Sequence, residues 1–77
     1  MVKPTRVTNS IRALRFAHGE MTQAQLAERI GVTRQTVIAI EQGRYSPSLE
    51  MAFKIARVFG VPLEEVFQYP EPPDEPT

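Results

Sequence analysis

The sequence predicts an all-α fold of five short helices, and three observations support this prediction. Apolar residues recur at helical spacing in five separate runs. Residues that cap helix starts precede most of these runs, and glycines follow several of them. No segment alternates between apolar and polar residues for long enough to predict a long strand. With 77 residues, the chain is expected to form a single domain.

The predicted helix starts share side chains whose oxygen can accept a hydrogen bond from the first turn. These N-cap residues are Asn9 or Ser10, Thr22, Thr33 and Ser48. Thr22 and Gln25 have the spacing of a capping box, and Pro62 suits the first turn of the last helix, PLEEVF. Helix stops are predicted at the sequence HGE and at Gly31, Gly43 and Gly60. The predicted helices therefore cover 11–17, 23–30, 34–42, 49–59 and 62–67.

Charge is unevenly distributed, although the formal net charge is zero. All nine basic residues lie between Lys3 and Arg57, together with only four acidic residues, so this part carries a net charge of +5. From Gly60 onward there are five acidic residues and no basic one. A basic body favours a polyanionic partner, although a charged surface is often simply solvated.

The composition excludes several function classes. Without Cys the chain has neither a disulfide framework nor a thiolate metal site. Because His18 is the only His and the serines lie at predicted caps and turns, we expect no enzyme activity, no metal and no cofactor. The start MVKPTR lacks the apolar core of a signal peptide, and no window has the roughly 20 apolar residues of a membrane helix. We therefore expect a cytoplasmic protein.

Residues 23–42 carry the most specific pattern in the chain. Two helices joined by about three residues must cross steeply, which requires a small residue at the crossing, a glycine in the turn and apolar residues on the facing sides. Ala27 and Gly31 meet the first two requirements. The facing apolar residues are Leu26, Ile30, Val32, Val37 and Ile40.

This pattern resembles the Cro/C1-type helix-turn-helix family of phage repressors and small stand-alone regulators. The resemblance covers roughly 9–67 and rests on TQAQLAERIGVTRQTV, IEQG and PSLEMAFKIARVFGV. It implies a compact, lambda-repressor-like domain of five helices, with the helix-turn-helix at the second and third, that binds double-stranded DNA. The sequence HGEM is one residue longer than the usual turn of the family, which puts the height of Gln23 over the DNA in doubt.

In such proteins the third helix enters the major groove, so the resemblance implies base contacts from this helix. The implied residues are Arg34, Gln35, Ile38 and Ala39. Arginine can pair bidentately with guanine and glutamine with adenine, and the two apolar side chains could meet a thymine methyl group. The alternative is that Arg34 and Gln35 form an ordinary solvated first turn, and that Ile38 is a single exposed apolar residue.

Other positions match family residues that hold the DNA backbone rather than read its sequence. They are Gln23, Thr33, Thr36, Arg44, Tyr45 and Ser46. Tyr45 could instead pack within the turn. Arg15 and Glu41 resemble a family pair that forms a salt bridge between the first and third helices.

A homodimer is expected, because one such domain reads only a few base pairs and specificity normally requires two half-sites. The fourth helix has two apolar stripes. Leu49, Ala52, Phe53, Ala56 and Phe59 share one of them. The other stripe and the fifth helix form the predicted dimer surface, which consists of Met51, Ile55, Val58, Leu63, Val66, Phe67 and Tyr69.

The chain is expected to divide into an N-terminal arm (1–8), the DNA-binding domain (9–69) and an acidic, proline-rich tail (70–77) that is disordered. Similar small regulators pair a segment before the first helix with one after the fifth. The candidates here are 6–8 and 67–69, with frayed ends as the alternative, and Pro70 would stop the second strand.

The sequence therefore predicts a homodimeric repressor that reads a palindromic operator. Two alternatives stay open. An antitoxin would also wrap a toxin with its tail, for which YPEPPDEPT is short and rich in proline. A helical protein-binding module would show no salt-dependent affinity for duplexes.

Overall fold

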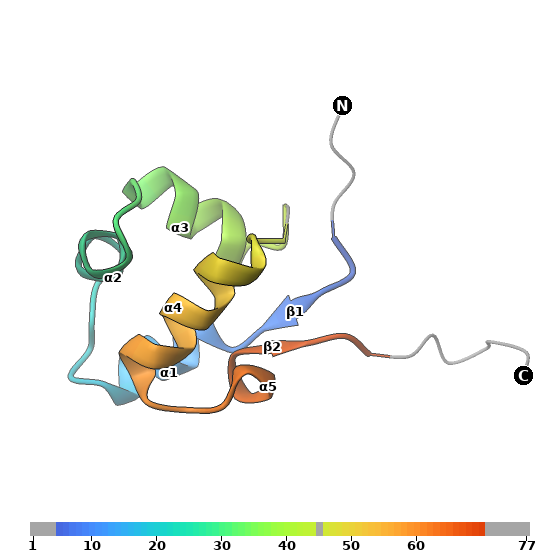
Figure 1. Cartoon of the computed structure of the whole chain (residues 1–77). Helices are drawn as coiled ribbons and strands as arrows, with labels where there is room; N and C mark the ends of the chain where they lie inside the picture. The colour runs from blue at the N-terminus through green and yellow to red at the C-terminus, as the bar shows by residue number, and fades with distance from the viewer. Residues whose placement is uncertain (1–4, 45, 71–77) are drawn as a thin grey trace, which may run out of the picture.

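The structure, a computed structural model, describes residues 5–44 and 46–70. These residues form five helices and one short antiparallel ribbon (Figure 1). The elements in chain order are β1 (Thr8–Asn9), α1 (Ile11–Ala17), α2 (Gln23–Ile30), α3 (Arg34–Glu41), α4 (Leu49–Phe59), α5 (Leu63–Val66) and β2 (Phe67–Gln68). The predicted helical fold with a terminal β-ribbon is confirmed.

Three helices begin at the predicted side-chain caps. The hydroxyl of Thr22 accepts a hydrogen bond from the amide of Gln25 at 3.0 Å, and the Gln25 side chain accepts one from the amide of Thr22 at 2.8 Å. This reciprocal pair is the predicted capping box. Thr33 and Ser48 each accept from the amide three residues later, at 3.2 and 3.1 Å respectively. Each cap satisfies a backbone N–H that the helix itself cannot pair.

Local sequence predicted the ends of α2 and α4 but not those of α5. α2 and α4 end at Gly31 and Gly60, both in the left-handed conformation, as predicted. α5 is shorter than predicted at both ends. Pro62 has an extended ψ of 156° and precedes the helix, while Phe67 is drawn into β2 by its pairing with Asn9.

The terminal ribbon closes the fold by joining its two ends. Thr8 pairs with Gln68 and Asn9 with Phe67, and the amide of Ser10 donates to the carbonyl oxygen of Val66 at 2.9 Å. β1 therefore begins two residues later and ends one residue later than the predicted segment 6–8, which brings it closer to α1. Figure 1 shows that both ends of the described chain leave the ribbon on the same side of the molecule.

The core contains one fully buried side chain from each helix. These side chains are Ile11, Leu26, Val37, Ile55 and Val66, in chain order. α2 packs against both α3 and α4, and Ala27 on α2 is also buried. Burying a large aliphatic side chain contributes about 1.5–3 kcal/mol. This set therefore fixes the direction in which each helix faces the core.

The burial of α4 corrects part of the predicted dimer surface. Ile55 and Val66 are 1% and 0% exposed, so they contact the core of their own copy and are not accessible to a partner. The buried residues of α4 come from both apolar stripes, and this helix packs against α2 and α5. Four other residues of the predicted surface are half-buried against the core, and Tyr69 is exposed. The four are Met51, Val58, Leu63 and Phe67.

Gly31 provides a test of the turn between α2 and α3. Its φ is +78°, and a Cβ at this position would meet no atom within 4 Å, so only the backbone conformation opposes a side chain. We expect Gly31→Ala to lower the free energy of unfolding by about 1 kcal/mol and Gly31→Asn to lower it less, because Asn enters this region more readily. Chemical denaturation of the three proteins measures this. An Ala variant as stable as the parent would contradict the account.

Candidate nucleic-acid interface

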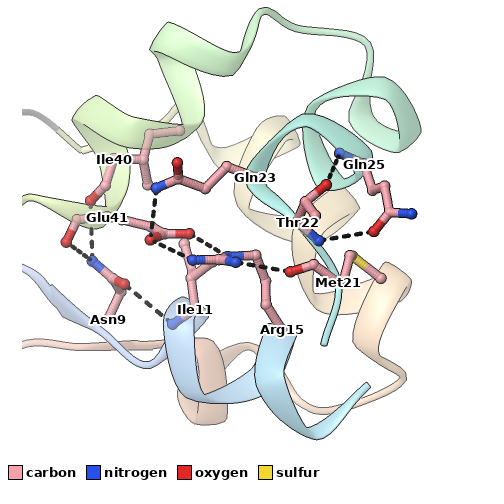
Figure 2. Close-up of polar contacts among 9 residues, drawn as sticks. All are labelled: Asn9, Ile11, Arg15, Met21, Thr22, Gln23, Gln25, Ile40 and Glu41. Atoms are coloured by element: carbon pink, nitrogen blue, oxygen red, sulfur yellow. Dashed lines mark hydrogen bonds and ion pairs between the residues drawn. The ribbon is translucent and has the colours of Figure 1, made fainter. Parts of the chain in front are cut away.

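An ion pair between α1 and α3 lies beside the helix-turn-helix (Figure 2). The Nε of Arg15 donates to Oε2 of Glu41 at 2.6 Å, and Nη2 donates to Oε1 at 3.1 Å. The two side chains are 14% and 9% exposed. Both guanidinium bonds are charge-assisted and nearly excluded from water, which makes this geometry strong and specific. The salt bridge predicted between the first and third helices is thus present.

The same pair also holds the start of α2. The third guanidinium nitrogen, Nη1 of Arg15, donates to the carbonyl oxygen of Met21 at 2.8 Å. Nε2 of Gln23 donates to Oε1 of Glu41 at 3.3 Å. Figure 2 shows Gln23 and Arg15 approaching the carboxylate of Glu41 from different elements. The first turn of α2 is therefore positioned relative to α3 by hydrogen bonds as well as by core packing.

Asn9 connects the start of α1 to the end of α3. Its Nδ2 donates to the carbonyl oxygens of Ile40 and Glu41 at 3.0 and 3.3 Å, and its Oδ1 accepts from the amide of Ile11 at 3.2 Å (Figure 2). Of the two predicted caps for this helix, Asn9 makes the bond and the Ser10 side chain makes none to the helix start. The contact of Asn9 with α3 depends on tertiary packing and could not be predicted from neighbouring residues.

These contacts line a hollow of about 610 Å³ on the surface formed by α1, α2 and α3. We refer to it as the polar hollow, and its lining residues are Asn9, Arg12, Arg15, Thr22, Gln23, Ala24, Arg34, Glu41 and Gln42. The structure thereby brings together Gln23 and Arg34, two residues assigned to DNA contacts from the sequence. Arg12 and Gln42 were not assigned. The spacing of Arg12, three residues before Arg15 on one helix, could have indicated the former.

α3 combines buried and exposed side chains. Val37 and Ile40 are buried in the core, whereas Arg34 and Gln35 in the first turn are exposed. The remaining two residues assigned to base contacts, Ile38 and Ala39, are half-buried. The first turn of α3 is thus more exposed to solvent than its middle.

The residues assigned to the DNA backbone lie at three places. Gln23 is half-buried at the start of α2, and since a glutamine amide has two hydrogens, its bond to Glu41 leaves one available. Thr33 and Thr36 lie at the start of α3, with their hydroxyl oxygens 3.1 Å apart. Arg44 and Ser46 follow α3 and are exposed, whereas Tyr45 lies outside the described residues.

Residues 5–44 and 46–70 contain no cluster of three or more side chains able to ligate a metal ion. His18 is exposed, with Nδ1 2.9 Å from the carbonyl oxygen of Leu14 and Nε2 3.1 Å from that of Phe59. Its ring packs edge-on against Phe59, with centroids 5.1 Å apart. His18 therefore has a structural role, joining the ends of α1 and α4. None of the described helices has the length and apolar character required to span a bilayer.

Comparisons with known proteins agree with this geometry. The model of the helix-turn-helix family matches residues 11–66. An uncharacterised HTH-type transcriptional regulator of Methanocaldococcus jannaschii, MJ0272, is 52% identical over 61 residues, which are 79% of this chain and 91% of that protein. The transcriptional repressor RstR of the cryptic phage CTXphi in Vibrio cholerae is 39% identical over 59 residues, 77% of this chain and 52% of the repressor.

A solved structure is similar over most of its length. The crystal structure of a Bacteroides fragilis protein described as DNA-binding superposes with a TM-score of 0.69 at 26% sequence identity. The match covers 80% of this chain and 98% of that one. The similarity therefore extends to the whole arrangement of helices and is not confined to the helix-turn-helix.

The ion pair can be tested by removing one partner. Arg15→Leu leaves the carboxylate of Glu41 nearly buried without its cation, and we expect the free energy of unfolding to fall by about 3 kcal/mol. The double variant Arg15→Leu/Glu41→Leu should recover part of this loss, because no charge is then left unpaired.

Arg12→Leu is the matched control, since Arg12 is an exposed arginine on the same helix, and its effect should be within about 0.5 kcal/mol. Urea denaturation of the four proteins gives the comparison. Equal losses for Arg15→Leu and Arg12→Leu would show that the pair does not stabilise the fold.

Proposed function

The chain belongs to the helix-turn-helix family, and we propose that it is a homodimeric repressor that reads a palindromic operator through the major groove. Family membership and relatives named as transcriptional regulators make it a DNA-binding transcriptional regulator and not an enzyme. The residue roles, the dimer and the operator symmetry are the proposed part. A DNA partner would also fit the expected cytoplasmic location.

The exposed first turn of α3 is the observation that carries the proposal. Within the described part of the chain, neither Arg34 nor Gln35 makes a side-chain hydrogen bond, although the next turn of the helix is anchored in the core. Arg34 and Gln35 thus have unused donors on a helix that is held by contacts with β1, α1 and α2. A base edge would satisfy those donors without any rearrangement of the fold.

Direct readout follows from the chemistry of these two side chains. The guanidinium of Arg34 can donate two parallel hydrogen bonds to O6 and N7 of guanine, and the amide of Gln35 can pair with N6 and N7 of adenine. Each such pair discriminates against a wrong base by roughly 1–3 kcal/mol. Ile38 and Ala39, half-buried one turn later, would add contacts to a thymine methyl group.

The DNA backbone would be held on both sides of this helix. Gln23 and Arg34 both line the polar hollow, and the amide hydrogen of Gln23 that Glu41 does not accept would donate to a phosphate there. Thr33 and Thr36 would contribute hydroxyl groups at the start of α3. Arg44, Tyr45 and Ser46 would hold the strand beyond its end.

A homodimer would supply the specificity that one copy lacks. A single domain of this size contacts few base pairs, whereas two copies on half-sites about 34 Å apart double the sequence that is read. The operator would then be palindromic, since its symmetry mirrors that of the protein. Repression would follow from occupying a promoter, which requires no further domain.

Selection of binding sites from a random duplex pool, followed by titration at several salt concentrations, tests the proposal. We expect a palindromic site whose affinity falls with salt with a log–log slope of about −0.9 per phosphate contacted. If no sequence is enriched and binding stays weak at low salt, the proposal is wrong and a protein partner becomes the better explanation.

Arg34→Ala tests the assignment of base readout. On the selected operator we expect the variant to lose roughly 1–3 kcal/mol of binding free energy and its preference at one base pair per half-site. Arg29→Ala is the matched control, because Arg29 is also an exposed arginine but does not line the polar hollow. If Arg34→Ala weakens all sequences equally, Arg34 holds the backbone and does not read bases.

A further inference from the structure

The side of α4 turned away from the core forms a second hollow, of about 460 Å³. It is lined by Leu49, Glu50, Phe53, Lys54 and Arg57, which we call the outer α4 face. None of these residues belongs to the polar hollow or to the proposed base contacts. The face therefore needs an explanation separate from the DNA contacts.

Two large apolar side chains lie open on this face. Leu49 is 67% exposed and Phe53 is 54% exposed, and they are four residues apart, hence neighbours on one side of the helix. Elsewhere in the described chain, the large exposed apolar residues are Phe16 on α1 and Tyr69 after β2, and neither lines this hollow. An apolar strip bordered by charges is typical of a surface that contacts another protein.

The charged residues of the face follow an order along the helix. Glu50 lies near its start and Arg57 near its end, and the two are seven positions apart, about two helical turns. Both side chains therefore lie on nearly the same line along α4. In residues 5–44 and 46–70, neither of them forms an ion pair.

This order is complementary to itself under a two-fold rotation. If two α4 helices pack antiparallel, Glu50 of each copy faces Arg57 of the other, so the contact contains the pair twice. The midpoint between these positions falls at Phe53 and Lys54. The two Phe53 rings would then meet beside the axis, while Lys54 at the edge could keep its ammonium group in water.

From this complementarity we propose that the outer α4 face is the surface through which two copies of the chain associate, antiparallel across a two-fold axis. The inference rests on the homodimer of the proposed function and supplies its interface. It replaces the dimer surface predicted from the sequence, of which Ile55 and Val66 are buried in the core. Five side chains form a small contact, so association is weaker than in obligate dimers and is strengthened on an operator with two half-sites.

The contact is compatible with DNA binding. Arg34 and Gln35 lie on α3, and the outer α4 face begins at Leu49, shortly after the exposed Ser46. The two-fold axis would lie beside Phe53 and Lys54, and the outer α4 face shares no residue with those expected to contact DNA. Both copies keep their first turn of α3 free.

Charge reversal tests the pairing. Sedimentation equilibrium of the full chain up to several hundred micromolar should show a monomer–dimer equilibrium, and Glu50→Arg or Arg57→Glu alone should weaken it roughly tenfold, because each places like charges together twice per dimer. The double variant Glu50→Arg/Arg57→Glu restores opposite charges across the axis and should dimerise nearly as well as the parent.

A loss of α4 stability would not produce this order of dimer affinities among the variants. Each reversal also puts a charge of the unfavourable sign at an end of α4, and the double variant carries both penalties, so it should unfold most easily while dimerising better than either single variant. Thermal unfolding of the same samples measures this. A monomeric parent, single variants with unchanged dimer affinity, or a double variant no better than the singles would each overturn the proposal.

Phe53→Ser and Phe16→Ser form a matched pair for the apolar part. Both remove an exposed phenyl ring, but only the first lies on the outer α4 face, so only Phe53→Ser should reduce dimerisation and lose the cooperative preference for a full palindrome over a half-site. Equal effects of the two variants would contradict the interface.

A single half-site duplex separates this inference from the proposed function. A failed interface with a valid DNA-binding function would leave half-site affinity and base preference intact in the Glu50 and Phe53 variants. A protein that binds no duplex would refute the proposed function, whatever its state of association.

Discussion

The guanidinium of Arg15 joins α1 to α3 and to the segment before α2, and the positions of α2 and α3 depend on it. It donates two hydrogen bonds to the carboxylate of Glu41 on α3 and one to the carbonyl of Met21, just before α2. Glu41 in turn accepts from Gln23. A domain of this size buries little surface, so core packing alone leaves helices some freedom to slide. Directional, charge-assisted bonds at a nearly buried site reduce that freedom.

The functional consequences concern α3. Val37 and Ile40 anchor this helix in the core, whereas Arg34 and Gln35 in its first turn are exposed, and Arg34 also lines the polar hollow. Because α3 is anchored in the core, its backbone needs no ordering when a partner binds. The basic residues are also confined to the part of the chain before Gly60, so the neutral total does not describe the charge that a duplex would meet. Fixed geometry and local charge thus act on the same surface.

Local features of the sequence predicted the fold well. The caps at Thr22, Thr33 and Ser48 and the left-handed Gly31 each depend on a few neighbouring residues, so the spacing alone identified them. The resemblance to a known family supplied the salt bridge between Arg15 and Glu41. The orientation of α4 could not be predicted in this way, because its buried residues come from both apolar stripes and depend on packing against α2 and α5. The bridging roles of Asn9 and His18 likewise depend on residues far away in the chain. The expected tail, 70–77, lies outside the described residues apart from Pro70.

The central claim is that the chain meets DNA with the first turn of α3 and the start of α2. The most direct measurement is a titration of isotope-labelled protein with an operator duplex, followed through the backbone amide resonances. The account predicts that the largest shifts cluster at Gln23, at 34–36 and at 44–46, with small changes at the exposed end of α1 around Phe16. Shifts that cluster instead around Phe16, or that spread evenly over the surface, would contradict it.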